Sequence, residues 1–294
     1  MPPTVISLRA GELRCDIRPE QGGCISGLWL GDLPVLRSTA TGAELDSVRN
    51  AGSYPLVPFS NRIAHARLKW NGTDHPLIQN FAPEPHAIHG IGWQRAWSVL
   101  ESEASFAMLS FEHRPDPTWP FAFDTSQTFR LGEDNTLELA LSITNQSDRP
   151  APVGLGWHPN FVKRARSRVA FAAAGRWEMG EDMLPTGRKA VHGLDADCAF
   201  LEIDHCFDGW SGQVDLRDEA LHVRISSPLS RLVVYTQPTE QIVAIEPVSH
   251  VNNALNMMGG GPEHGARADE LGVRVLQPGE SLTAQMSVAV ERVR

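Results

Sequence analysis

The sequence predicts an all-β protein, a sandwich or a barrel of many short strands with few short helices. Apolar and polar residues alternate in several stretches, which is the pattern of strands with one buried face. Residues that favour turns separate these stretches, and patterns with the 3.6-residue period of a helix are nearly absent. Many short strands between turns are typical of sandwiches and barrels.

Four stretches carry the alternation most clearly, and each holds apolar residues two positions apart. They are residues 13–17, 137–143, 221–225 and 282–290. The turn signals between predicted strands are Gly22-Gly23, Asn71-Gly72, Gly132–Asn135, Asp208-Gly209 and Pro278-Gly279. Only Ala40–Asn50 suggests a helix, and a short one. Because strand patterns occur near both ends of the chain, we expect both ends to be built into the sheets.

Length and charge narrow the classes of protein. The 294 residues suffice for one large β domain or two average ones, and no repeat, low-complexity tract or linker divides them. The net charge of −9 disfavours nucleic acid and anionic membranes as partners. No secretory signal and no apolar run of the ~20 residues that span a membrane is visible. The four widely spaced cysteines are interpreted as free thiols, so we expect a cytoplasmic protein.

Two distant segments offer an acid and a base. Ala151–Phe161 contains His158, and a histidine titrates near neutral pH. Val243–Asn256 contains Glu246 in an apolar run, where partial desolvation would raise the pKa of its carboxyl and make it a better base. Together the two could transfer protons on one small molecule. Two alternatives stay open: Glu246 could face solvent, and Trp157 could pack in the core or stack on a sugar ring.

Further polar residues could bind a ligand. Asn61 and Arg62 lie where a loop is predicted to enter a strand, and a guanidinium suits adjacent hydroxyls or carboxylates. Alternatively, Arg62 pairs with a nearby acid. His86 and His89 are three residues apart, and in an extended strand they would face opposite sides, which disfavours a metal pair. His89, beside Gly90, is better interpreted as a donor to a sugar hydroxyl.

Two later segments are less specific. Asp204 could accept hydrogen bonds from two vicinal hydroxyls, whereas Asp208 precedes a glycine and is better interpreted as a turn residue. Residues 257–267, with the sequence MMGGGPEHGAR, form either a loop at the mouth of the site or a plain surface loop.

Five motifs in this order resemble the aldose 1-epimerase (galactose mutarotase) family, in a divergent bacterial-type branch. They are SNRIAHARLKWNG, HAIHGIGW, GLGWHPNF, DHCFDGW and IEPVSHVNNALN. The resemblance runs from about Gly22 to the C-terminus. It implies one domain over residues 1–294 with the fold of such proteins, a large antiparallel β-sandwich of the galactose mutarotase-like supersandwich type. It also implies an isomerase that interconverts the α and β anomers of a free aldohexose or related aldose.

The resemblance also implies roles for single residues. His158 is similar to the family's general acid and Glu246 to its general base, while Arg62, His89 and Asp204 are similar to its sugar-hydroxyl contacts. Asn61 and Trp157 would be additional contacts. No metal and no organic cofactor is implied, and the expected partner is a small-molecule sugar bound by a monomer or homodimer.

Some expectations stay open. The segment after the histidine–glycine pair is shorter than in the best-known galactose mutarotases, so the reaction is inferred more firmly than galactose as the substrate. A sugar with an anion at C6 would need a basic residue in the pocket, for which Arg62, Arg67 and Lys69 are candidates. The alternatives are a non-catalytic sugar-binding protein of the same fold, or a polysaccharide lyase or glycoside hydrolase using Asp204 and Glu246 as its carboxylate pair.

Overall fold

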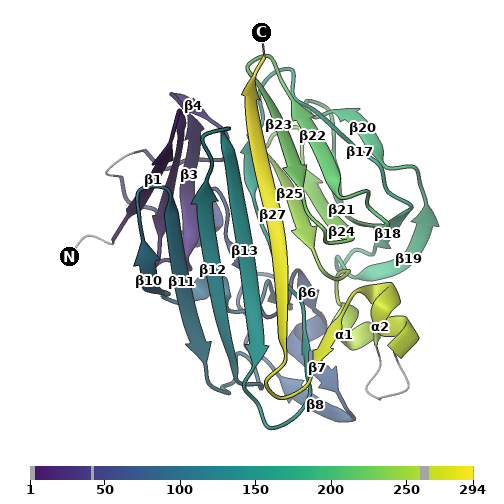
Figure 1. Cartoon of the computed structure of the whole chain (residues 1–294). Coiled ribbons are helices and arrows are strands. Elements are labelled where there is room, and N and C mark those ends of the chain that lie inside the picture. The colour runs from purple at the N-terminus through teal and green to yellow at the C-terminus, as the bar shows by residue number, and fades with distance from the viewer. Residues whose placement is uncertain (1–3, 41–42, 259–264, 294) are drawn as a thin grey trace.

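The computed structural model describes residues 4–40, 43–258 and 265–293, and it confirms the all-β prediction. A nine-stranded antiparallel sheet forms the front layer in Figure 1. In order across the sheet, its strands are β10 (Ser98–Ser102), β11 (Phe106–His113), β12 (Phe123–Leu131), β13 (Thr136–Asn145), β27 (Ser281–Arg292), β23 (Leu221–Ser226), β22 (Gln213–Arg217), β17 (Arg168–Phe171) and β20 (Leu194–Asp197).

An eight-stranded antiparallel sheet contributes most strands of the site described below. In order it contains β19 (Pro185–Ala190), β18 (Gly175–Met179), β21 (Ile203–Asp208), β24 (Arg231–Thr236), β25 (Ile242–Val248), β15 (Gly156–Trp157) and β5 (Pro55–Leu56), and β16 (Asn160–Val162) also pairs with β25.

Smaller elements complete the described part of the chain. A four-stranded sheet contains β1 (Ile6–Ala10), β2 (Leu13–Arg18), β3 (Cys24–Leu30) and β4 (Leu33–Pro34). Three two-stranded pairs are β6 (Arg62–Ile63) with β9 (Ala87–Ile88), β7 (Arg67–Trp70) with β8 (Thr73–Pro76), and β14 (Ala151–Val153) with β26 (Arg274–Leu276). The helices are α1 (Ala254–Met257), α2 (Gly265–Leu271) and three 3-10 turns at Val48–Asn50, Ala64–Ala66 and Gly92–Gln94.

The alternation in the sequence corresponds to strands with one buried face. Along β13 and β27, buried residues alternate with more exposed ones, and the two strands pair so that Leu139 lies opposite Met286. The apolar positions predicted in 13–17, 137–143 and 221–225 are buried, as are those from 284 to 290. The first and last of these stretches lie in β2 and β27, so the prediction that both ends enter the sheets is confirmed.

Turn chemistry is also confirmed, whereas the predicted helix is largely wrong. Asn71 and Gly72 both have positive φ, +48° and +71°, and they connect β7 to β8, as a tight hairpin turn requires. In Ala40–Asn50, residues 41–42 lie outside the described ranges, and the rest forms only the 3-10 turn Val48–Asn50, capped by Ser47. Arg49 in this segment, and Arg37 just before it, line the cavity described below.

The layers pack around one apolar core, whose buried members run from Leu8 to Val290. Gln127 of β12 links the layers, because its amide donates to the carbonyl of Gly23 (3.0 Å) and accepts from the indole of Trp157 in β15 (3.1 Å). None of the helices in the described ranges has the length and apolarity needed to cross a membrane. Through Gln127, the nine-stranded sheet therefore supports the eight-stranded sheet, whose strands hold most of the functional side chains.

Candidate active site

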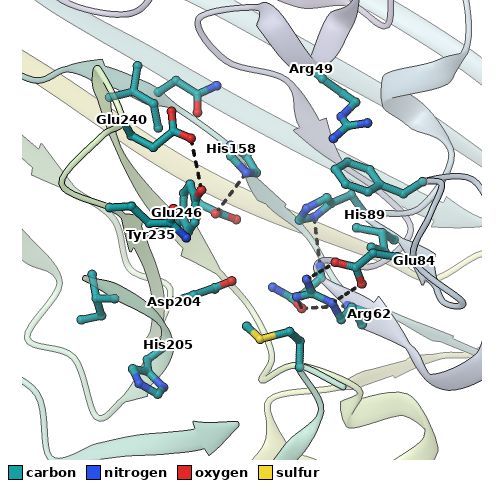
Figure 2. A pocket seen from close by; sticks show the side chains of 18 of the residues that line it. Arg49, Arg62, Glu84, His89, His158, Asp204, His205, Tyr235, Glu240 and Glu246 are labelled. Carbon is teal, nitrogen blue, oxygen red and sulfur yellow. Dashed lines mark hydrogen bonds and ion pairs between the residues drawn. The ribbon is translucent and has the colours of Figure 1, made fainter. Parts of the chain in front are cut away.

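A cavity of about 680 Å³ brings together six of the seven predicted site residues from five separate segments. They are Asn61, Arg62, His89, His158, Asp204 and Glu246. Figure 2 shows five of these side chains around one space: His158 and Glu246 lie on one side, and Arg62 and Asp204 lie toward one end, with His89 between His158 and Arg62. Strands β21, β24 and β25 form one wall, and loops that follow β5 and β9 form the other.

His158 is held by the strand that precedes it. Strand β15 pairs with β5, and the backbone N–H of His158 donates to the carbonyl of Tyr54 (3.0 Å). Its imidazole stacks on the Tyr54 ring with centroids 4.7 Å apart. Burial lowers the pKa of His158 to about 4, and its Nδ1 has no hydrogen-bond partner among the described residues. The imidazole is therefore fixed in position, and burial disfavours a positive charge on it.

Glu246 lies within β25 and is 2% exposed, so it does not face solvent. Its Oε1 lies 3.3 Å from Nε2 of His158, and its Oε2 has no partner among the described residues. Burial, and then the nearby carboxyl of Asp204, raises the pKa of Glu246 well above its usual range. Such a carboxyl binds a proton readily, as a general base must.

His158 and Glu246 act as a coupled pair. Burial disfavours a charge on either group. At pH values between the two pKa values of the pair, the two side chains therefore share one proton, which lies on one or the other side of their 3.3 Å contact. With this proton on His158, an acid and a base stand side by side. They can then address two atoms bonded to the same carbon of a substrate, one giving a proton and the other taking one.

Arg62 satisfies both interpretations made from the sequence, because it pairs with an acid and also lines the cavity. Its Nε and Nη2 donate to the carboxylate of Glu84 at 2.9 and 2.6 Å, and its Nη1 donates to Oδ1 of Asn61 (3.2 Å). A guanidinium has five N–H donors, so two remain for a ligand. Asn61 adopts a left-handed φ of +53°, which turns the chain sharply into β6.

His89 is neutral and oriented as a donor. Its Nδ1 accepts from the backbone N–H of Asn61 (3.1 Å), so the ring proton lies on Nε2. Burial, and then His158, lowers the pKa of His89 well below its usual range. His86 makes separate contacts, to the N–H of His65 and the carbonyl of Asp182. In the ranges that the structure describes, no three histidine, cysteine or carboxylate side chains are grouped as metal ligands.

Asp204 lines the cavity from β21, opposite Arg62 in Figure 2, and burial raises its pKa. No hydrogen bond or ion pair within the described residues occupies its carboxylate, which leaves it able to accept sugar hydroxyls. Asp208 at the end of the same strand is a structural residue, because it accepts from Arg188 (2.6 Å) and from the indole of Trp177 (2.8 Å).

Trp157 is a correction. Its side chain is 1% exposed, donates to Gln127 and does not line the cavity, so it is not the additional sugar contact that the family resemblance implied. Alternation explains the difference, because consecutive strand residues point to opposite faces and His158 takes the cavity side. The core alternative for Trp157 is the correct one.

Sequence reasoning missed Tyr54 and Glu84, which contact two of the predicted residues. Their roles arise from pairing across the fold, and no local pattern marks either residue. The expected loop over 257–267 falls largely on residues 259–264, outside the described ranges. Met257 and Met258 are described, and neither lines the cavity.

Comparisons with known proteins agree with the fold. The sequence profile described as "Aldose 1-epimerase" matches residues 4–289. The uncharacterized protein YphB of Escherichia coli K12 is 29% identical over 98% of this chain and 99% of its own length. A crystal structure from Escherichia coli K12, named as a candidate aldose 1-epimerase, superposes with a TM-score of 0.86 at 28% identity, covering 99% of each chain.

A second solved structure shows the fold alone. The galactose mutarotase-like protein from Clostridium acetobutylicum has a TM-score of 0.83 at 19% identity, covering 98% of this chain and 95% of that one. The large antiparallel β-sandwich expected from the motifs is thus the observed fold. Because the family profile matches nearly its whole length, the chain belongs to the aldose 1-epimerase family.

Proposed function

We propose that the protein interconverts the α and β anomers of a free aldose by acid–base opening and closure of the sugar ring. The observation that carries the proposal is the His158–Glu246 pair, 3.3 Å apart inside a cavity that hydrogen-bonding side chains line. A protein that only bound sugar would not need two buried groups with pKa values shifted in opposite directions.

The reaction requires two proton transfers, one at each of the two oxygen atoms bonded to C1. Glu246 takes the proton from the C1 hydroxyl while His158 gives one to the ring oxygen, so the bond from C1 to the ring oxygen breaks and a C1 carbonyl forms. Rotation about C1–C2 presents the other face of the aldehyde. On closure the roles reverse, and both residues return to their starting states. No redox step occurs and no further reactant is consumed.

The other lining residues would hold the sugar while C1 turns. His89 presents its Nε2 proton, Arg62 its two remaining N–H groups, and Asp204 a carboxylate that no described residue binds. Asn61 accepts with its oxygen from Arg62, which leaves its amide nitrogen for a hydroxyl. Donors and acceptors of this kind match the vicinal hydroxyls of an aldose.

The charged groups that line the cavity are mixed, so its charge does not by itself select an anionic sugar. Five carboxyl side chains line it against three guanidinium groups: Glu84, Glu202, Asp204, Glu240 and Glu246 against Arg37, Arg49 and Arg62. Of the basic residues considered from the sequence for an anion at C6, Arg62 is bound to Glu84. Arg67 pairs with Asp74, and neither Arg67 nor Lys69 lines the cavity.

Polarimetry tests the proposal directly. We expect the purified protein to accelerate the change in optical rotation of freshly dissolved α-D-glucose or α-D-galactose, with the same final rotation as in buffer alone. Heat-inactivated protein is the control. The panel continues through other aldoses and sugars with an anion at C6. If no sugar in it is accelerated, while binding is detected by calorimetry, the protein is a sugar-binding protein and the proposal is wrong.

The pH dependence follows from the shared proton. Below the pKa of about 4 of His158, a second proton leaves the pair without a base. Above the raised pKa of Glu246, loss of the only proton leaves it without an acid. We therefore expect kcat/KM, corrected for the buffer-catalysed rate, to be bell-shaped. Its alkaline limb should lie well above the pKa of an ordinary carboxyl. A rate that keeps rising with pH, with no alkaline limb, would contradict the requirement for an acid.

A further inference from the structure

Tyr54 contacts His158 in two ways. Its carbonyl accepts the backbone N–H of His158, and its ring stacks on the imidazole with an interplanar angle of 19°. On the proposed function, we infer that Tyr54 is a positioning residue for the acid: its ring fixes and stabilises the protonated imidazole of His158, and its hydroxyl binds the sugar. No motif in the sequence indicates this role.

The Tyr54 ring is itself rigidly held. The residue is 4% exposed and precedes β5, whose pairing with β15 sets the distance between Tyr54 and His158. The indole of Trp93 lies 5.9 Å away, and His89 meets the Tyr54 ring edge-on at 6.1 Å. Trp93 and His89 therefore hold the Tyr54 ring in place, and the ring can constrain the plane of the His158 imidazole stacked on it.

The ring compensates for what His158 lacks. Nδ1 of His158 has no partner among the described residues, so a protonated imidazole finds Glu246 at 3.3 Å and the π face of Tyr54 at 4.7 Å. A cation within about 6 Å of a tyrosine face is stabilised by the ring's negative face. Removing the ring should reduce the fraction of pairs in which the proton lies on His158, which is the fraction that can react.

The hydroxyl serves a separate purpose. Tyr54 lines the cavity, and the structure gives its hydroxyl no hydrogen-bond partner among the described residues. The adjacent guanidinium groups of Arg37 and Arg49 also line the cavity. Arg37 is held by the carbonyls of Ala51 and Arg49. The Tyr54 hydroxyl is thus placed to accept or donate a hydrogen bond to a sugar beside the imidazole.

Two substitutions separate these roles. Tyr54→Phe keeps the ring, so we expect kcat to be nearly preserved and KM to rise. Tyr54→Leu removes the ring, so kcat should fall about tenfold relative to Tyr54→Phe. The acid limb of its pH profile should move to lower pH, because the protonated imidazole has lost a stabilising contact, while the alkaline limb, governed by Glu246, should stay in place. If Tyr54→Leu does not fold, Tyr54→Met provides a flexible, ring-free side chain.

A titration tests the ring without turnover. In a Glu246→Gln background His158 titrates without its carboxyl partner, while the neighbouring His89 and Arg37 are unchanged in every variant compared. NMR should find the pKa of His158 lower with Tyr54→Leu than with Tyr54→Phe by up to about one unit. Tyr235, the other tyrosine of the chain, also lines the cavity but does not stack on His158, so Tyr235→Leu is the matched control and should leave this pKa unchanged.

The outcomes are distinguishable. Equal kcat and equal His158 titration in Tyr54→Leu and Tyr54→Phe would overturn the inference while leaving mutarotation intact. Absence of turnover in the unmodified protein would contradict the proposed function, but the titration would still report whether the ring stabilises the imidazolium. A fall in kcat without any change in titration or in the acid limb would reduce Tyr54 to a structural residue.

Discussion

Replacing Glu246 with glutamine is expected to lower kcat by a factor of about 10²–10⁴ while sugar binding is largely kept. Glutamine fills the same space beside Nε2 of His158 but cannot take a proton from the C1 hydroxyl. Because burial raises the pKa of Glu246, this carboxyl lowers the stability of the folded state at pH values above the pKa of an ordinary carboxyl. Glutamine carries no charge, so we do not expect the substitution to destabilise the fold. Polarimetry gives kcat, calorimetry gives sugar affinity and thermal unfolding gives stability.

Glu240→Gln is the matched control. Glu240 lines the same cavity and accepts from the hydroxyl of Tyr235 (3.4 Å), but it makes no contact with His158. We expect little change in kcat in this variant. If Glu246→Gln kept the full kcat, Glu246 would not be the base, and Asp204, which also has a raised pKa, would be examined next.

Replacing His158 with asparagine is expected to lower kcat to a similar degree, because asparagine can donate a hydrogen bond but cannot protonate the ring oxygen. His89 should not substitute as the acid, since its Nδ1 is engaged by Asn61 and burial lowers its pKa well below the usual range. The two substitutions together should cost little more than either alone, since the groups act as one unit. Single and double variants are compared by polarimetry at neutral pH.

His205→Asn is the control for the loss of a histidine from the cavity wall. The Nδ1 of His205 contacts the carbonyl of Trp177 (2.9 Å), and the residue takes no part in the proposed proton transfers. Its kcat should stay close to that of the unmodified protein. Retained activity in His158→Asn would assign the proton donation to another group, and His89→Asn would identify or dismiss the first candidate.

These variants also separate the rival functions. A sugar-binding protein would bind sugar but show no turnover, with or without these substitutions. A hydrolase would require Asp204 and Glu246 on opposite sides of a glycosidic bond and would release reducing ends from an oligosaccharide. Hydrolysis does not use the buried contact between His158 and Glu246. Proton transfers at two oxygen atoms bonded to the same carbon use this contact directly.

The strands and turns could be predicted from the sequence because each depends on neighbours within a few residues. Residues two apart share a face of a strand, so the apolar positions of β13 and β27 identified their buried faces. Asn71-Gly72 tolerates positive φ, so the hairpin between β7 and β8 was also predictable. The segment 40–50 misled because its helical pattern is weak and a helix this short is marginal, and its described residues form only the 3-10 turn Val48–Asn50.

Sequence alone thus determined the strand-rich fold class, the turns and the segments that carry the polar residues, and resemblance to a family suggested their roles. Only the tertiary structure decided which side chains meet. Sheet register and strand pairing placed Glu246 against His158, Tyr54 under its ring and Glu84 on Arg62, while they turned Trp157 into the core. Such contacts join residues far apart in the chain, and their desolvation sets the pKa values on which the chemistry depends, so no local pattern can encode them.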